Sequence, residues 1–352
     1  MLDNLAIVGF KFNHHGKYSG YQQIVHYLNP FVYLDRDKFN YTYPLLNFKG
    51  GRFINQFLKR VGDKMFFDEL YKICNNPDIR IIHFLYPENT LAFCPFEIPH
   101  DKIVIGTFHQ PNEYFLEQIK NNNELAIKNY NRCDKAILLC YEQINDFKSL
   151  TGIKSVHFIP HGIDTTRFKP TNIKRKDNHI LFLGNWLRDF ECAAGVFQAL
   201  NRINKNIKVT VVCNKENHEY FVGIPSVQCY YNVSDDYLLH LLQTYTLLFL
   251  PLKNSTANNA LIEAVACGLP ILTTDLKSVS NYLELLNFMK FPLSMHNDHN
   301  SLANKILLFL NSYQDRLMLS NNLTECVGNY SWGVIANRTI EVYQLNKLCL
   351  EL

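Results

Sequence analysis

Short apolar runs recur along this chain, and each is followed by a turn and then by apolar residues at helical spacing. In the first half these runs span residues 5–10, 79–84, 103–107, 136–139 and 155–159. A strand that is covered on both faces reads as a continuous apolar run, and parallel neighbours need a crossover helix between them. The pattern therefore predicts an α/β fold built on a doubly wound parallel sheet.

The same pattern starts again after the polar segment 171–178. Further apolar runs span residues 180–183, 208–213, 247–250 and 271–274, and no internal repeat relates the two sets. A chain of 352 residues has room for about two domains. We therefore expect two Rossmann-like domains, at residues 1–170 and 171–331, which face each other across a cleft. This arrangement would put the carboxyl ends of both sheets around the cleft, and open α/β sheets bind ligands at those ends.

Two helices are clear from the sequence. Ser234 is suited to cap a helix over residues 234–243, where leucines share one face. Residues 332–345 also carry apolar side chains at helical spacing. We expect this last segment, residues 332–352, to pack back onto the first domain.

Composition excludes several classes of protein. Hydrophobic residues make up 47% of the chain and charged residues 19%, which is typical of a globular protein and not of a disordered one. A net charge of +3, without a basic stripe, argues against nucleic acid as a partner. The one basic cluster, residues 174–176, follows Pro170 and is expected to be a solvated linker.

Cysteine use and hydropathy indicate location. The ten cysteines are scattered and form no Cys-x-x-Cys pair, so reduced, buried thiols are expected. There is no basic-then-apolar leader, and the most apolar window, residues 238–252, is shorter than the ~20 residues that span a bilayer. We expect a cytoplasmic protein, with peripheral association at the cytoplasmic face of a membrane left open.

The most informative stretch is residues 251–270, which runs from the end of a strand through a helix to a glycine. Small polar residues stand where the helix begins: Ser255, Thr256, Asn258 and Asn259. Side chains and free N–H groups at a helix N-terminus suit a diphosphate. Glu263 lies one turn beyond Asn259 on the same face, either as an acceptor for sugar or ribose hydroxyls or as an ordinary surface glutamate.

Two segments of the chain resemble a known enzyme family. Phe-Ile-Pro-His-Gly-Ile-Asp-Thr-Thr-Arg-Phe-Lys-Pro at 158–170 is similar to the interdomain signature of the retaining glycosyltransferases of family 4. Glu-Ala-Val-Ala-Cys-Gly-Leu-Pro at 263–270 resembles their donor-site helix. Thr-Phe-His at 107–109, Leu-Gly-Asn at 183–185 and Val-Ser-Asp-Asp-Tyr-Leu at 233–238 follow in the family's order, so the resemblance covers nearly the whole chain.

The resemblance implies a fold of the GT-B type, with the acceptor held mainly by the first domain and a nucleotide sugar by the second. It implies transfer with retention, no cofactor and usually no metal. In the family the donor helix carries two glutamates eight residues apart, and the second binds ribose. Glu263 stands in the second place and Ser255 in the first, so recognition of the sugar differs here.

Cations should stabilise the diphosphate leaving group. Gly184 opens the loop in which the family places an arginine directly after the glycine, whereas this chain has Asn185 there and Arg188 further on. Arg188 is our first candidate and Lys253, at a strand end, the second. Without the family context, Arg188 reads as a solvated loop residue.

His109 follows an apolar run, so its ring should point into the cleft, where the family has a residue that touches the transferred sugar. We expect it to position the sugar, although a lone histidine is more often structural. Gly16 and Gly20 in the loop 12–21 would let backbone N–H groups approach a phosphate or acceptor. His14 and His15 in the same loop lack metal-site geometry, and no metal is expected.

The nucleobase has the weakest candidates, Tyr231 and Val233, together with the turn 213–217. Tyr231 could stack on a base or be a surface tyrosine. The overall expectation is a retaining glycosyltransferase that acts on a glycan, a lipid-linked or another acceptor. The alternatives are a non-catalytic nucleotide-sugar-binding or scaffold subunit, made credible by Ser255 and Asn185, and a nucleotide-sugar epimerase or a phosphorylase of the same shape.

Overall fold

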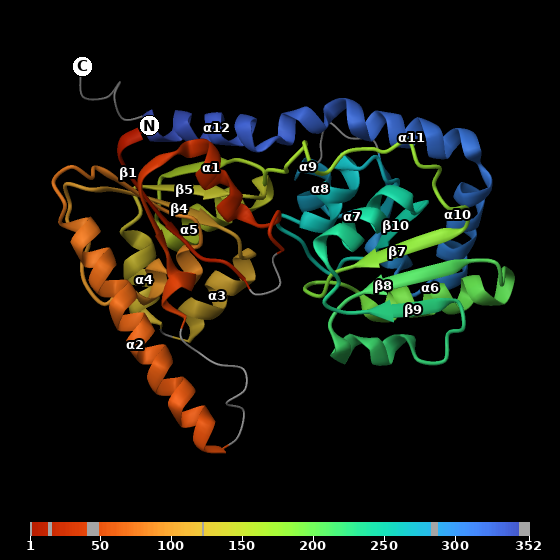
Figure 1. Cartoon of the computed structure of the whole chain (residues 1–352), viewed down its shortest axis with the longest axis horizontal. Helices are drawn as coiled ribbons and strands as arrows, with labels where there is room; N and C mark the ends of the chain where they lie inside the picture. Colours follow the sequence, from red (N-terminus) through yellow and green to blue (C-terminus); the bar gives the residue numbers. More distant parts are fainter. Residues whose placement is uncertain (1, 13–15, 41–48, 122, 283–287, 345–352) are drawn as a thin grey trace. The chain divides into compact units, whose positions relative to one another are not determined.

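The computed structural model describes residues 2–12, 16–40, 49–121, 123–282 and 288–344. The chain divides into two compact units: the first comprises residues 1–15, 20–160 and 335–352, and the second comprises residues 16–19 and 161–334. Each unit is built around a six-stranded, wholly parallel sheet with helices against it (Figure 1). This is the doubly wound α/β architecture that the apolar runs predict.

The sheet of the first unit has the strand order β2-β1-β3-β4-β5-β6. Its strands are β1 (Leu2–Gly9), β2 (Pro30–Asp35), β3 (Ile81–Phe84), β4 (Ile103–Phe108), β5 (Lys135–Leu138) and β6 (Ser155–Phe158). Its helices are α1 (Val25–Leu28), α2 (Lys49–Cys74), α3 (Asn112–Lys120), α4 (Glu124–Asn131) and α5 (Ile144–Thr151).

Both faces of the first sheet are covered. Side chains alternate along a strand, so Ile82 and Phe84 of β3 lie in a core with α2, α3, α4 and α5, while His83 points to the other face. There its Nδ1 is 2.7 Å from the hydroxyl of Tyr343, in the last helix, α12 (Trp332–Gln344). The final segment thus belongs to the first unit from Ile335 onward.

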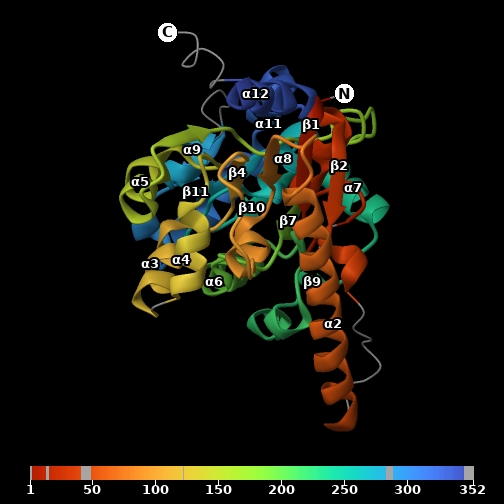
Figure 2. The ribbon, with the colours of Figure 1, turned by 90° about the vertical axis from the view of Figure 1, so that its left-hand side faces the viewer.

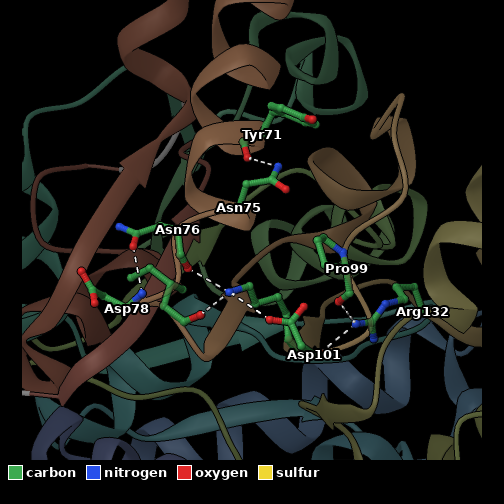
Figure 3. Close-up of polar contacts among 9 residues, drawn as sticks. Tyr71, Asn75, Asn76, Asp78, Pro99, Asp101 and Arg132 are labelled. Atoms are coloured by element: carbon green, nitrogen blue, oxygen red, sulfur yellow. Dashed lines mark hydrogen bonds and ion pairs between the residues drawn. The ribbon is translucent and has the colours of Figure 1, made fainter.

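Near the amino ends of strands in this sheet, cationic side chains donate hydrogen bonds to main-chain carbonyls. Lys102, directly before β4, is 5% exposed, and its Nζ donates to the carbonyls of Asn76 and Ile79 at 2.8 and 2.7 Å. The Arg132 guanidinium donates to the carbonyl of Pro99 (Figure 3) and to that of Lys102. These cations therefore stabilise the loops before the strands. Open α/β sheets bind ligands at the opposite, carboxyl ends of their strands, so we look for binding groups there.

The sheet of the second unit has the order β12-β11-β10-β7-β8-β9. Its strands are β7 (His179–Leu183), β8 (Lys208–Val212), β9 (Val227–Tyr230), β10 (Leu247–Leu250), β11 (Ile271–Thr274) and β12 (Met289–Phe291). Its helices are α6 (Phe190–Ile203), α7 (Asp235–Thr244), α8 (Asn259–Ala266), α9 (Lys277–Tyr282), α10 (His299–Asn311) and α11 (Tyr313–Cys326).

Two separate cores flank the second sheet. α7 and α8 pack with Leu181 and Leu248 on one face, and α6 and α10 pack with Phe182 and Phe249 on the other. Ser234 caps α7 as predicted, because its hydroxyl accepts from the N–H of Tyr237 at 3.2 Å. A sheet buried on both faces explains why its central strands read as unbroken apolar runs.

The main segment of the second unit begins at His161, ahead of the boundary expected after residue 170. Ile163 and Phe168 belong to the core around α8, and Ile163 pairs with Ser331 in an isolated parallel bridge. The apolar residues within the signature segment therefore anchor it to the second unit. Burial of these two side chains, which the run of polar neighbours conceals in the sequence, accounts for the difference.

The basic cluster at 174–176 is not simply a solvated linker, which corrects the sequence interpretation. Arg175 donates to the carbonyls of Leu242 and Tyr245 near the end of α7 and to that of Cys267 after α8. Its charge therefore satisfies the carbonyl groups left open at two helix C-termini. Only its flanking lysines are exposed.

Eight of the cysteines are free thiols, as expected: seven of these are buried and Cys229 is half-buried. Burial raises the pKa of several of them, Cys192 and Cys213 to about 12, which keeps these thiols protonated and unreactive. Within the described ranges, no helix is long and apolar enough to cross a bilayer.

Candidate functional site

The order of strands in the second sheet marks one position for a ligand. The connections run from β7 to β8 on one side and return to β10 on the other, so the loops after β7 and β10 separate at a switch point. Open α/β sheets bind ligands in the crevice at this point, outside the carboxyl ends of the strands. The segments there are residues 184–189 and 251–259, which contain most of the predicted donor-site residues.

Arg188 lies at this switch point and carries an unneutralised charge. Its Nε and Nη1 donate to the carbonyls of Leu183 and Trp186, each at 2.9 Å, and its Nη2 donates to Oδ1 of Asn258 at 3.1 Å. Among the residues that the structure describes, no carboxylate forms an ion pair with it. Burial lowers the pKa of Arg188 to about 10, so the guanidinium stays charged at neutral pH.

The loop after β7 is shaped to place this arginine. Gly184 has a φ of 98°, and a Cβ there would lie 2.6 Å from Nη2 of Arg188. The loop is fastened to the end of β10 by an isolated antiparallel bridge between Arg188 and Leu252 and by the N–H of Lys253, which donates to the carbonyl of Leu187 at 3.0 Å. Arg188 is therefore a positioned residue, which decides against a solvated loop arginine.

The N-terminus of α8 meets Arg188 through Asn258. Asn258 is the N-cap of the helix, but its side chain makes no cap hydrogen bond and instead accepts from Arg188. The N–H of Leu261 donates to the carbonyl of Asn258 at 3.1 Å, whereas the N–H groups of Asn259 and Ala260, the first two residues of the helix, have no acceptor within it and remain suited to an anion. Ser255, Thr256 and Asn258 are 5–6% exposed, whereas Asn259 is half-buried and Lys253 exposed.

Glu263 is a buried carboxyl on α8, which contradicts the alternative of a surface glutamate. It is 5% exposed, and no hydrogen bond or ion pair to its side chain is found in the described parts of the chain. Burial, with a smaller effect of the charge on Asp235, raises its pKa to about 8. A carboxyl in this state gains from any ligand that donates hydrogen bonds to it.

Asp235, the first residue of α7, is a centre of contacts that the sequence did not reveal. Its Oδ2 accepts from the N–H of Lys17 at 2.8 Å, and a Cβ on Gly16 would lie 2.0 Å from its Oδ1. A side chain at position 16 would therefore displace the Asp235 carboxylate from this contact. The ring of Tyr18 lies 3.8 Å from the guanidinium of Arg167, which holds the same short segment in place.

A buried polar network supports the loop after β7 from behind. Oδ2 of Asp189 is 2.7 Å from Nδ1 of His296, whose Nε2 is 2.9 Å from the hydroxyl of Thr274. That hydroxyl oxygen accepts from the N–H of Leu252, and Oδ1 of Asp189 caps α6. Only the cap was visible in the sequence, as an aspartate directly before a helical pattern, because the other partners are distant along the chain.

The predicted nucleobase residues lie after β8 and β9. Asn185 bridges to this region: its Oδ1 accepts from the N–H of Asn214 at 2.5 Å. Tyr231 is 50% exposed, with Nζ of Lys215 4.2 Å from its ring centroid, and Val233 is half-buried. Asn185 therefore has a loop-bridging role, while an exposed ring at a strand end leaves both interpretations of Tyr231 open.

His109, in the first unit, is held by a buried glutamate that the sequence analysis did not single out. The Glu88 Oε1 accepts from the N–H groups of His109 and Gln110 at 2.6 and 3.0 Å. The His109 Nε2 is 2.8 Å from the carbonyl of Leu85, and its ring stacks on Tyr86. Burial raises the pKa of Glu88 to about 7. Glu88 follows the β3 run by four residues, and that position at the carboxyl end was its only sequence signal.

The structure thus unites part of the predicted set in the second unit: Gly184, Arg188, Lys253, Ser255, Thr256, Asn258, Asn259 and Glu263 surround the switch point and α8. Gly20 and His109 belong to the first unit, where Gly20 has a φ of 96° before a 3-10 turn at Tyr21–Ile24. His14 and His15 lie outside the described residues. Within those residues no cluster of three metal-ligating side chains occurs.

Comparison with known proteins gives one match in sequence and many in structure. Residues 177–312 match the sequence model of the family described as glycosyl transferases group 1. No curated protein sequence matches the chain. The matched range runs from β7 to α10 and contains both loops of the switch point.

Several solved structures share the fold at low sequence identity. Anabaena Alr3699/HepE, in complex with UDP and glucose, has a TM-score of 0.68 at 11% identity and covers 97% of this chain and 99% of its own. An E. coli structure described as trehalose-6-phosphate bound with UDP-2-fluoro glucose has a TM-score of 0.71 at 10% identity, covering 96% and 98%.

A third is the sucrose-phosphate synthase from Thermosynechococcus elongatus, with a TM-score of 0.64 at 17% identity over 82% of this chain and 79% of its own. At these identities the likeness concerns the fold alone. The sequence match thus covers residues 177–312, and the chain has the fold of the GT-B type that these structures share.

Proposed function

We propose that the chain is a retaining glycosyltransferase of family 4 that moves a sugar from a nucleoside-diphosphate sugar to a glycan, a lipid-linked or another acceptor. The observation that carries the proposal is Arg188, a half-buried cation without an ion-pair partner among the described residues that meets the N-terminus of α8 inside the matched range. The leaving group of such a transfer is a diphosphate. Its growing negative charge needs a fixed cation and fixed N–H dipoles.

The second unit supplies both kinds of group. Arg188 and the first N–H groups of α8 would hold the two phosphates, and the exposed amine of Lys253 could approach the same charge. Because the arginine is already held by three hydrogen bonds, little reorganisation accompanies binding. Asn258 would then stay between the helix and the guanidinium as a spacer.

Glu263 would receive the ribose. Its carboxyl is partly protonated at neutral pH because burial raises its pKa to about 8. Two ribose hydroxyls that donate to this carboxyl would stabilise the ionised form. Ligand binding is then accompanied by release of a proton, and affinity rises with pH up to the pKa of the free site.

For the transfer itself, we assign His109 to positioning of the sugar and not to general-base catalysis. Retention then follows from front-face attack, in which the departing phosphate accepts the proton of the acceptor hydroxyl. Ser255 stands where the family has its first glutamate, so the sugar is recognised differently. We propose that no metal or cofactor takes part, that nucleic acid is not a partner, and that the reaction occurs in the cytoplasm.

A second candidate function is a non-catalytic subunit that binds nucleotide sugars. Ser255 favours it, since a hydroxyl replaces the carboxylate that the family uses at this place. Asn185 favours it as well, because its side-chain oxygen is bound to the loop at Asn214. Binding without turnover would distinguish this candidate from the enzyme.

The test is a thermal-shift and turnover screen of the purified chain against UDP-, GDP-, ADP- and dTDP-sugars, with and without a chelator. UDP-glucose comes first, because UDP and glucose occupy the similar HepE structure. We expect stabilisation by one nucleotide and slow, chelator-insensitive release of the diphosphate.

The matched variants are Arg188→Met and Arg202→Met, the second on the exposed side of α6. Loss of one phosphate contact costs about 1.5–3 kcal/mol, so we expect at least a tenfold weaker affinity for Arg188→Met alone. Equal binding by both variants would refute the site. Binding without turnover of any donor would support the second candidate.

A further inference from the structure

The long helix α2 (Lys49–Cys74) packs on the first unit with only its second half. Phe66, Leu70 and Cys74 are fully buried at four-residue spacing, and they fix which face of the helix meets the core. Between Phe53 and Val61, in contrast, no residue is buried. In both views this half of α2 extends beyond the strands of its unit (Figures 1 and 2).

The projecting half carries large apolar side chains on the face that turns away from the core. Phe57 precedes Phe66 by nine residues, which is about two and a half helical turns, so the two rings lie on opposite sides of α2. Phe53 and Phe57 are four residues apart and share this outer face, with Ile54 at its border. Their exposed fractions are 79%, 65% and 48% in the order Phe53, Phe57, Ile54.

Cations lie beside this apolar face. Arg60 follows Phe57 by three residues and Lys64 by seven, so both share its side of α2. Both are exposed, and in the described part of the chain neither forms an ion pair. The one acid between Phe53 and Met65 is Asp63, and it is already paired with Arg36 at 2.8 Å. The surface therefore offers two positive charges without an ion pair beside three exposed apolar side chains.

We propose that the amino-terminal half of α2 docks onto an anionic membrane surface. Phe53, Ile54 and Phe57 would enter the boundary between headgroups and acyl chains, while Arg60 and Lys64 would contact anionic headgroups. Interfacial helices combine apolar residues on one face with lysine and arginine beside them. Exposed apolar side chains alone would suit many kinds of partner. The neighbouring cations without ion pairs favour a negatively charged lipid surface, because they can contact its anionic headgroups.

The inference goes beyond the proposed glycosyl transfer and does not depend on it. None of these residues belongs to the switch point of the second unit or to the His109 loop. The helix would lie on the bilayer and not cross it, because α2 is not apolar enough to span a membrane. Failure of the docking test would thus leave the proposed activity untouched.

The experiment measures co-sedimentation of the full chain with vesicles of phosphatidylcholine alone and of phosphatidylcholine with phosphatidylglycerol. We expect binding to the anionic vesicles only, which weakens as salt is added. The double variant Phe53→Ser/Phe57→Ser should bind roughly tenfold less or weaker still. The control Val222→Ser/Leu308→Ser removes side chains that are as exposed, 79% and 74%, from the second unit and should bind like the native chain.

A second pair of variants tests the charges. Arg60→Gln/Lys64→Gln should lose roughly tenfold in binding to anionic vesicles, whereas Lys120→Gln/Lys128→Gln, at exposed positions on α3 and α4, should not. Thermal melting verifies that all four variants fold. In addition, Phe57→Trp should show a blue shift of its fluorescence when anionic vesicles are added, which would locate the contact on α2 itself.

Two results would overturn the proposal. One is equal binding of the Phe53/Phe57 variant and its control to anionic vesicles. The other is a native dimer in light scattering that the Phe53→Ser/Phe57→Ser variant converts to a monomer, because a second copy of the chain would then cover this face.

Discussion

At the scale of single residues, the second unit contains two ionisable groups that do not pair with each other, the half-buried Arg188 and the buried Glu263. Arg188 is bound to carbonyl and amide oxygens, and Glu263 has no partner among the described residues. Burying a charge without an opposite charge costs stability. A fold retains such groups where a ligand completes them, which is why these two residues define the candidate site.

The state of Glu263 predicts a pH-dependent effect of Glu263→Gln on stability. Burial raises the pKa of Glu263 from 4.5 to about 8, so the folded chain binds a proton there that the unfolded chain releases. The contribution of this bound proton to the free energy of unfolding is complete below pH 4.5 and is lost as the pH rises through 8. The amide cannot ionise, so we expect the variant to gain more than about 1 kcal/mol over the native chain between pH 5 and pH 9.

Denaturant unfolding at several pH values measures this difference. Glu219→Gln, at an exposed position, serves as the control and should show a difference that does not depend on pH. A pH-independent difference for Glu263→Gln would mean that the carboxyl is ionised in the folded chain throughout this range.

At the scale of elements, the loop after β7 converts a strand end into a binding position. Gly184 takes a positive φ, Leu187 takes another at 59°, and the chain between them folds back so that Arg188 pairs with Leu252. Left-handed backbone is strained for residues other than glycine, and strained loops occur where function demands a geometry. The loop around Gly184 therefore fixes the position of the Arg188 guanidinium.

We predict that Gly184→Ala weakens both stability and nucleotide binding. The left-handed backbone alone costs an alanine about 1 kcal/mol. The new Cβ would also lie 2.6 Å from Nη2 of Arg188 and displace it. Gly223→Ala isolates the backbone cost, because Gly223 has a φ of 79° with nothing within 4 Å of an added Cβ.

Both variants should unfold at lower denaturant concentration than the native chain, and only Gly184→Ala should also lose the thermal shift with nucleotide. An unchanged nucleotide response in Gly184→Ala would show that the position of Arg188 does not matter for binding.

At the scale of the whole molecule, the chain returns at its end to the unit in which it began. The hydroxyl of Tyr343 meets Nδ1 of His83, 260 residues earlier in the sequence, and Nζ of Lys135 donates to the carbonyl of Val342. Burial lowers the pKa of His83 to about 3, so its imidazole is neutral and needs neutral partners. From Ile335 onward, the last helix is therefore part of the first unit's structure.

Tyr343→Phe tests this closure of the chain. The substitution keeps the ring but leaves the buried Nδ1 of His83 without its hydroxyl partner, at an expected cost of about 1–3 kcal/mol. Tyr313→Phe, at a position that is 65% exposed, should change stability by less than about 0.5 kcal/mol. Thermal unfolding of the two variants compares them directly, and equal melting temperatures would contradict a structural role for the Tyr343 hydroxyl.

The sequence alone predicted the strands that are buried on both faces, since these must be apolar along their whole length. It did not predict β2, β9 and β12, which are three of the four edge strands and have mixed burial; the fourth edge strand, β6, was predicted from the run at 155–159. An edge strand has one neighbour and partial solvent contact, so it needs no continuous apolar run and often leaves little trace in the sequence.

For the site, sequence patterns were sufficient where chemistry depends on local spacing. Residues 255–263 around the start of α8 are an example, because a strand end, small polar residues and a helix follow one another directly. The partners of Arg188, the clamp of Glu88 on His109, and the network of Asp189 with His296 join residues that are far apart along the chain. Only the tertiary structure determines which distant side chains meet, because those contacts depend on strand order and packing and not on local spacing.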